Sequence, residues 1–187
     1  MAHARTEVSQ SEPCADTPVS EASGSFEAVF ESHYPRIARV IARVVGDTAC
    51  AEELAMEVFW KFWQTPAAQG ELAGGWLCRS AIHLGISELR RRARHARYQR
   101  LVRLAGQSTP EQLHAADEEQ RQVRAVLAAI PARDAELLLL RSNDFTYEQL
   151  ASTLDLNPAS VGTLIARARQ TFRKEFTKRY GEPRMGN

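Results

Sequence analysis

The chain has 187 residues, 44% of them hydrophobic and 25% charged, which fits one medium domain or two small ones and excludes a low-complexity or fibrous protein. Its formal net charge of +1 hides two basic stretches, LRRRARHARYQRLVR (89–103) and RARQTFRKEFTKR (167–179), and such clusters favour a nucleic-acid partner. No apolar run approaches the roughly 20 residues that span a bilayer, so we expect no membrane insertion.

The three cysteines are widely separated in the sequence, and no Cys/His group has the spacing of a zinc site. We therefore expect reduced thiols, no metal and no other cofactor. The N-terminus also lacks the apolar core of a signal peptide, which predicts a cytoplasmic protein.

The N-terminal segment 1–24 is rich in Ser, Ala, Glu and Pro and has no apolar period, so it predicts a disordered leader. Order is expected to begin at Ser25, a plausible N-cap. Apolar residues then recur at steps of three and four, which predicts a helix that Pro35 kinks or divides and Gly46 ends.

A second helix is expected to begin at a cap formed by Asp47 or Thr48 and to end before the Thr65-Pro66 pair. After a glycine-containing loop, WLCRSAIHLGISELRRRARHARY (76–98) predicts a third helix whose C-terminal half is strongly basic. These three helices make up a first domain over residues 25–100.

Periodicity fades over 101–117, where we expect a flexible linker, and a second helical domain follows over 118–180 with a short tail at 181–187. Strict alternation of polar and apolar residues is absent throughout, as are hairpin turn signals. The predicted fold class is all-α, with two small helical domains, of which the C-terminal one contains a helix-turn-helix.

The helix-turn-helix prediction depends on the segment FTYEQLASTLDLNPASVGTLIARAR. Thr146 and Gln149 have the spacing of a capping box, and Asp155 stands at the turn, where a positive φ is tolerated better by Asp than by most residues. Asn157 caps the second helix and Pro158 occupies its first position. The alternative from the residues alone is a plain helical hairpin within a bundle.

The outer face of the second helix begins with small polar residues, which permit close approach to base edges. Gly162 in mid-helix costs about 1 kcal/mol relative to Ala, and our hypothesis is that a larger side chain there would collide with DNA. The residues that we expect to bind DNA are Asn157, Ser160, Gly162, Thr163, Arg167, Arg169 and Arg173.

With these motifs in place, residues 25–180 resemble the sigma factors of bacterial RNA polymerase, in particular the compact extracytoplasmic-function type of the sigma-seventy family. The segment FEAVFESHYPRIARVIARVVGDTACAEELAMEVFWKFWQ is similar to region two of that family, and IPARDAELLLLRSNDFTYEQLASTLDLNPASVGTLIARARQTFR is similar to region four. The resemblance implies a non-enzymatic protein that binds core RNA polymerase and promoter DNA. We also expect an anti-sigma factor as a partner and a free chain that is monomeric.

In region two, the resemblance implies that one helix binds the clamp helices of the polymerase through Glu53, Met56, Glu57 and Trp60. Glu53 replaces the usual Asp and Met56 a common Gln, which removes one polar contact. The following helix of the family opens the promoter and grips the minus-ten element. The matching positions here are Trp76, Arg79, His83, Arg90, Arg91 and Arg92.

Several positions depart from the family pattern. Ile82 and His83 stand where Arg and Asn are usual, Ser87 replaces Asp, and Gly162 and Leu164 replace basic residues of the region-four helix. Binding to DNA must therefore depend more on the remaining arginines and on the polymerase. From the residues alone, Trp76 could equally belong to the core, and the arginine run could be a solvated helix end.

Two other functions stay open. A helix-turn-helix regulator could bind DNA or polymerase without initiating transcription, and a structural helical adaptor would bind no DNA. An adaptor would leave the arginine clusters unexplained, whereas the departures at Ile82, His83, Gly162 and Leu164 are compatible with a regulator.

Overall fold

The computed structural model describes residues 20–70, 73–102 and 115–181, and within these ranges it contains helices and no strand. The all-α prediction is therefore confirmed. In chain order the elements are α1 (Ser20–Val45), α2 (Thr48–Trp63), the short 3-10 helix η1 (Pro66–Ala68), α3 (Ala73–Val102), α4 (Ala115–Ala129), α5 (Ala132–Ser142), α6 (Tyr147–Leu154) and α7 (Pro158–Tyr180).

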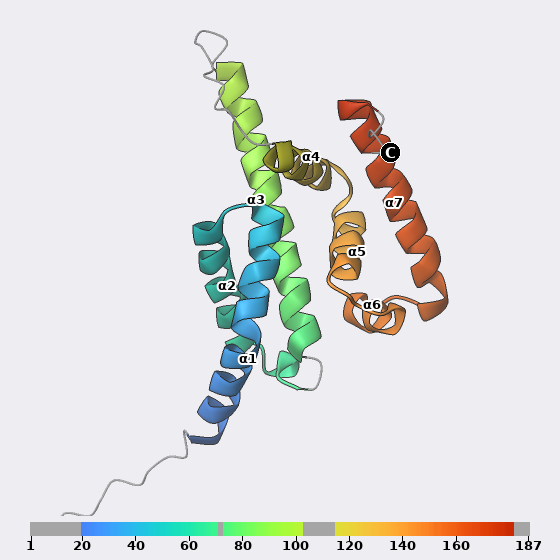
Figure 1. Cartoon of the computed structure of the whole chain (residues 1–187). Helices are drawn as coiled ribbons and strands as arrows, with labels where there is room; N and C mark the ends of the chain where they lie inside the picture. Colours follow the sequence, from blue (N-terminus) through green and yellow to red (C-terminus); the bar gives the residue numbers. More distant parts are fainter. Residues whose placement is uncertain (1–19, 71–72, 103–114, 182–187) are drawn as a thin grey trace, which may run out of the picture.

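Helices α1, α2 and α3 form the first domain, with α3 packed against both of the others (Figure 1). Helix α1 begins at Ser20, before the expected start at Ser25, and continues unbroken through Pro35. It ends at Gly46, whose φ of 72° lies in the left-handed region that favours glycine. Asp47 then caps α2 by accepting a 3.2 Å hydrogen bond from the backbone N–H of Cys50.

The core of the first domain is apolar and contains an aromatic group at the α1–α2 contact. Phe59 lies fully inside, with the Phe30 ring 4.9 Å and the Phe26 ring 6.5 Å from its centre, both roughly edge to face. Such edge-to-face pairs add to the stabilisation from buried area. Ile82, where the family usually has Arg, is also fully buried, so this departure belongs to the core and exposes nothing to DNA.

Helices α4 to α7 form the second domain, and α6 and α7 have the expected helix-turn-helix geometry. Thr146 and Gln149 make both hydrogen bonds of the capping box. Asp155 adopts the left-handed conformation at φ 52°. Asn157 caps α7 by accepting from the Ala159 N–H at 3.0 Å, and Pro158 is its first residue. The local predictions for this segment are confirmed.

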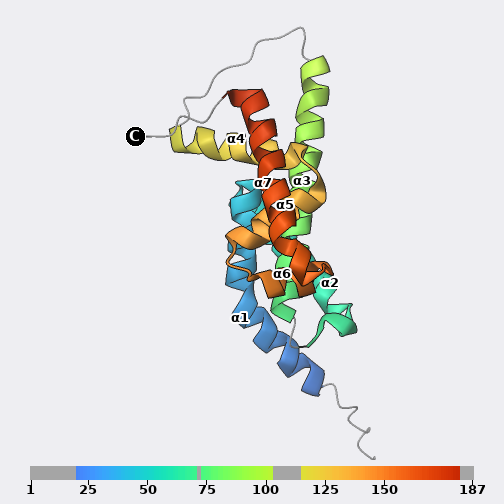
Figure 2. The same cartoon turned by 90° about the vertical axis from the view of Figure 1, so that its right-hand side faces the viewer.

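The two domains pack against each other along α3. Helix α3 contacts α1 and α2 as well as α4, α5 and α6, so it lies between the two domains (Figure 1). In Figure 2, α5 and α7 lie in front of α3. The buried apolar side chains of both domains belong to one continuous cluster. Helix α3 extends to Val102 and α4 starts at Ala115, so residues 103–114 of the expected linker lie outside the described residues, as do most of the leader and the tail 182–187.

Candidate polymerase and nucleic-acid interfaces

Helix α2 presents one exposed face that contains all four side chains expected to bind the polymerase. Their spacing of three, one and three residues places them on a single stripe of a helix. Met56 is 53% and Trp60 is 62% exposed. Neighbouring exposed apolar side chains of this size are typical of an interaction surface. The stripe consists of Glu53, Met56, Glu57 and Trp60.

A groove of about 670 Å³ between α1 and α2 extends this stripe. Phe26, Phe30 and Trp63 line it together with Met56 and Trp60. Glu57, which follows Met56 on the stripe, forms a 2.7 Å ion pair with Lys61. The α1 aromatics were not among the expected contact residues. Their spacing of four residues on a helix was the available signal, but it indicates core packing equally well.

Trp76, one of the expected minus-ten residues, packs partly against the core of the first domain. Its ring centre lies 5.8 Å from that of Phe62, and the side chain is half-buried. The remaining surface of Trp76 lines a groove of about 390 Å³ together with Arg79, Ser152 and Thr153. Both interpretations of Trp76 therefore apply in part, since one side packs and the other faces a groove shared with the second domain.

Three of the expected minus-ten side chains contact the second domain. Arg79 Nη1 donates a 2.7 Å hydrogen bond to the carbonyl of Thr153 at the end of α6. Arg90 Nη2 donates a 2.6 Å hydrogen bond to the carbonyl of Ile130, just after α4. His83, between them on α3, places Nδ1 2.8 Å from a carboxylate oxygen of Glu136 on α5.

Arg91 and Arg92 have a different role, because both donate to the carboxylate of Glu88. Arg91 makes two hydrogen bonds of 2.6 and 2.7 Å, and Arg92 makes one of 2.7 Å and a second contact of 3.2 Å with Asp47. Glu88 is only 8% exposed. The hydrogen bonds from Arg91 and then Arg92 lower its pKa to about 2, against the opposing effect of burial.

The three arginines 90–92 therefore have different partners in the structure. Arg91 and Arg92 neutralise Glu88, and the i, i+3 and i, i+4 spacings made this pairing visible in the sequence. Arg90 belongs instead to a groove of about 530 Å³ between α3, α4 and α7. Arg94, Arg97 and Arg179 line the same groove over a floor of alanines, so it is strongly basic.

The outer face of α7 is open to solvent at its N-terminal end. Ser160, Thr163 and Arg167 are all exposed, and their spacing places them on one side of the helix. Asn157 at the cap is exposed next to them. These four residues form a compact polar surface suited to the major groove, which we call the α7 reading face.

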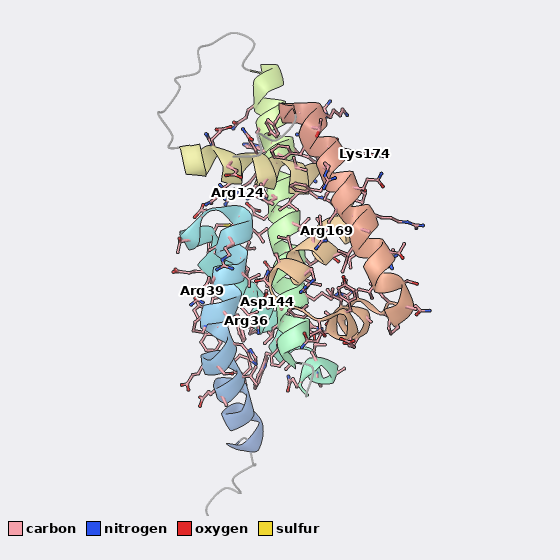
Figure 3. All side chains as sticks on the ribbon, turned by 45° about the vertical axis from the view of Figure 1, so that its right-hand side comes forward. Arg36, Arg39, Arg124, Asp144, Arg169 and Lys174 are labelled. Carbon is pink, nitrogen blue, oxygen red and sulfur yellow. The ribbon has the colours of Figure 1, made fainter. Side chains whose placement is uncertain are left out.

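Arg169 and Arg173 lie apart from the α7 reading face. Arg169 comes nine positions after Ser160, about two and a half helical turns, and therefore points to the opposite side. Both arginines line an apolar groove of about 540 Å³ with residues of α4 and α5. Figure 3 labels Arg169 on α7. Gly162 is also turned away, since a Cβ there would lie 3.6 Å from Tyr147 of α6.

Within the described ranges, no group of three or more His, Cys, Asp or Glu side chains could hold a metal ion. In the same ranges no helix is long and apolar enough to cross a bilayer. Cys50 and Cys78 are free thiols, and burial raises the pKa of Cys78 to about 11.

Two family models match the parts of the chain that contain these surfaces. Residues 29–95 match the family model described as Sigma-70 region 2, and residues 120–172 match Sigma-70 region 4. The first match contains the α2 stripe and the expected minus-ten residues, and the second contains the helix-turn-helix. Bearing both regions in this order, the chain belongs to the sigma-70 family of RNA polymerase sigma factors.

Two curated relatives agree with this assignment. The chain is 27% identical over 189 residues to the ECF RNA polymerase sigma factor SigE of Mycolicibacterium smegmatis, an alignment covering 94% of this chain and 73% of the relative. It is 29% identical over 178 residues to the probable RNA polymerase sigma factor RfaY of Xanthomonas campestris pv. campestris, covering 90% of this chain and 44% of that protein.

A solved structure supports the fold. The sigma factor RpoE of Bartonella quintana, crystallised in complex with the anti-sigma factor NepR, superposes with a TM-score of 0.50 at 19% identity. The match covers 81% of this chain and 96% of RpoE. At this identity the likeness concerns the fold alone.

Proposed function

We propose that this sigma-70 family protein directs core RNA polymerase to promoters by docking through the α2 stripe and the adjoining aromatic groove. The observation that carries the proposal is the exposure of Met56 and Trp60 beside Phe26, Phe30 and Trp63. Exposed aromatic and Met side chains around a groove are typical of the centres of protein interfaces. Glu53 and Glu57 supply acidic groups on the same stripe for basic residues of the polymerase.

Promoter reading is divided between the two domains in this proposal. The α7 reading face enters the major groove at the minus-thirty-five element, where Ser, Thr and Arg side chains can reach base edges and phosphates. Trp76, Arg79 and His83 on α3 receive unstacked bases of the non-template strand, because aromatic and cationic side chains bind single strands by stacking and charge. Transcript synthesis remains with the polymerase, so no residue of this chain is assigned a catalytic role.

We assign Arg90 to the DNA-binding surface of α3 as well, because it lines the basic groove together with Arg94 and Arg97. Phosphates of the melted strand are suitable ligands for these guanidinium groups. Arg91 and Arg92 contribute mainly through Glu88. We propose further that the free chain is monomeric and that an anti-sigma factor binds it by covering the polymerase-docking and DNA faces.

The experiment that tests this proposal is in vitro transcription. The purified chain is mixed with core RNA polymerase and fragmented DNA from its own source, and run-off transcripts are sequenced. The account predicts discrete start sites that core alone does not produce. Co-elution with core without new start sites would support a regulator, and absence of co-elution would remove the polymerase-binding claim.

The alternative of a regulator that does not initiate has one structural observation in its favour. The side chains of Arg79 and His83 are occupied by Thr153 and Glu136 of the second domain, as they would be in a protein that does not capture single-stranded DNA. The transcription assay separates the two functions directly.

A further inference from the structure

The basic groove between α3, α4 and α7 has charged walls and an apolar floor. We propose that it binds a nucleotide with two or three phosphates, which places the phosphates on the guanidinium groups and the base on the floor. The proposal goes beyond the proposed function, since neither polymerase docking nor promoter reading requires a small ligand. We call the site the arginine groove after Arg90, Arg94, Arg97 and Arg179, which line it.

The charge of the arginine groove suits more than one phosphate. Arg90, Arg94 and Arg97 lie four and three residues apart on α3, so they share one face of that helix. Among the residues that the structure describes, neither Asp nor Glu lines the groove. Arg179 donates a 2.6 Å hydrogen bond to Glu175 of its own helix, which leaves three cations for a ligand. A single phosphate group carries at most about two negative charges, so three cations indicate a diphosphate or triphosphate.

Arg90 has a hydrogen-bond donor that lacks an acceptor. Its Nη2 donates a 2.6 Å hydrogen bond to the carbonyl of Ile130, which holds the guanidinium between α3 and α4. Its Nε is buried and has no hydrogen-bond partner within the described part of the chain. A buried donor without an acceptor is unfavourable and calls for an explanation. A phosphate oxygen bound beside Arg90 would supply the missing acceptor.

The floor of the arginine groove consists of alanines from α3 and α4. Alanines at a crossing of two helices usually permit close packing, and they are then buried. Three of the five remain exposed, so the floor is an open apolar strip. No side chain beyond Cβ projects from this strip, so a planar base can lie on it, and a guanidinium can stack on the other face of the ring. The five residues are Ala93, Ala96, Ala125, Ala128 and Ala129, of which Ala93, Ala96 and Ala129 are exposed.

The size and lining of the groove favour a small ligand over a DNA strand. Its volume of about 530 Å³ lies within the range of about 300–1,000 Å³ that is usual for small-molecule sites. Sites for single strands use aromatic side chains on which successive bases stack, and no aromatic residue belongs to the described lining. Helix α4 lies between α3 and α7 at this point (Figure 1), so the ligand contacts both domains.

The first test titrates the full chain with ADP by isothermal titration calorimetry. Adenosine and inorganic pyrophosphate serve as the two halves of the ligand. ADP should bind about tenfold more tightly than pyrophosphate, because burial of the base adds to the phosphate contacts, and adenosine should bind most weakly. ADP should also raise the melting temperature. Equal affinities for ADP and pyrophosphate would reduce the groove to an anion site and overturn the nucleotide assignment, and so would the absence of binding.

The second test covers the floor without removing a charge. Ala93→Leu places a larger side chain at an exposed position, so folding should change little. It should weaken ADP binding about tenfold, since the base loses its place on the floor, and leave pyrophosphate binding unchanged. Ala49→Leu, at an exposed alanine of α2, is the matched control and should change neither affinity. Wild-type affinity for ADP in Ala93→Leu would contradict the placement of the base.

The third test removes the charges one at a time. Arg94→Ala and Arg97→Ala should each weaken ADP and pyrophosphate binding alike, by about tenfold, since a guanidinium–phosphate contact is lost. Both arginines are exposed, so folding is not at risk. Arg39→Ala makes the same charge change on α1 and should leave both affinities unchanged. An equal loss in Arg39→Ala would mean that ADP responds only to net charge, and the proposal would fail.

A final comparison separates the nucleotide site from the proposed function, which assigns Arg90 to the melted strand. Saturating ADP should raise the apparent Kd of a non-template-strand minus-ten oligonucleotide, because both ligands use the same guanidinium groups. Failure of the oligonucleotide to bind would count against the proposed function alone, since calorimetry detects ADP without any DNA. Oligonucleotide binding that is lost in Arg94→Ala, in a chain that does not bind ADP, would assign the groove to DNA and overturn the nucleotide site.

Discussion

The carboxylate of Glu88, almost fully buried on α3, accepts three hydrogen bonds of 2.6–2.7 Å from Arg91 and Arg92. Burial of a carboxylate is tolerated when charged hydrogen-bond partners compensate for the lost water. Arg92 in turn reaches Asp47, the cap of α2, at 3.2 Å. Arg92 therefore connects α3 to the turn between α1 and α2. Arg91 and Arg92 both have a structural role through Glu88.

Glu88→Gln should reduce the free energy of unfolding at pH 7 by about 1.5–3 kcal/mol, the range for hydrogen bonds to charged groups. The folded-state pKa of Glu88 is lowered from 4.5 to about 2. The stabilisation is therefore fully present above pH 4.5 and is lost as the pH falls toward 2. Denaturant unfolding of both proteins at several pH values measures this.

The matched control is Glu57→Gln, which removes the exposed 2.7 Å pair with Lys61 and should cost less than about 0.5 kcal/mol. A difference between wild type and Glu88→Gln that stayed constant from pH 7 to pH 3 would contradict the assignment of the effect to the ionised carboxylate.

Trp60→Ala should weaken binding to core polymerase by about 2 kcal/mol, roughly thirtyfold, because an exposed Trp at the centre of an interface is a typical hot spot. Folding should change little, since the side chain is 62% exposed. Binding to labelled core is measured by fluorescence anisotropy. Arg39→Ala, an exposed change on α1, serves as the control, and equal effects of the two variants would argue against docking through the α2 stripe.

Arg167→Ala should weaken minus-thirty-five binding by the assembled polymerase by about 1–3 kcal/mol if it reaches a base, and should lower the salt slope by about 0.9 if it contacts a phosphate. Arg169→Ala should change neither, because Arg169 lines the groove with α4 and α5 on the other side of α7. Titrations at several salt concentrations distinguish these cases. The account fails here if Arg169→Ala has the larger effect.

Gly162→Ala should raise the free energy of unfolding by about 0.5–1 kcal/mol, the usual gain over glycine within a helix. Room exists for the methyl group, since the nearest atom, on Tyr147, is 3.6 Å away. Because the position faces α6, minus-thirty-five binding should stay within about twofold. A large loss of DNA binding in the stabilised variant would revive the hypothesis that glycine leaves space for the duplex.

Local signals made the helix-turn-helix predictable. The capping box at Thr146, the left-handed Asp155 and the Asn157-Pro158 start are each set by neighbours within a few residues, and the sequence contains those neighbours. The separation of Arg169 from the α7 reading face also follows from the helical period, so it could have been predicted. The pairing of Arg91 and Arg92 with Glu88 was visible for the same reason.

The contact between the domains could not be predicted in this way. Arg79 and Thr153 are 74 positions apart, and Arg90 and Ile130 are 40 apart. No sequence pattern near Arg79 or Arg90 predicts that the guanidinium donates to a distant backbone carbonyl. The continuous helix through Pro35 also depends on residues distant in the sequence. Packing of α1 against α2 and α3 outweighs the hydrogen bond that Pro35 removes.

The central claim is that this chain gives core polymerase the ability to open promoters, and permanganate reactivity of unpaired thymines tests it most directly. On a promoter found by run-off sequencing, the account predicts reactive thymines upstream of the start site only when core and chain are both present, with the signal reduced in Arg79→Ala. Stable binding of the chain to core and promoter without any reactive thymine would contradict the claim and identify a regulator that does not initiate.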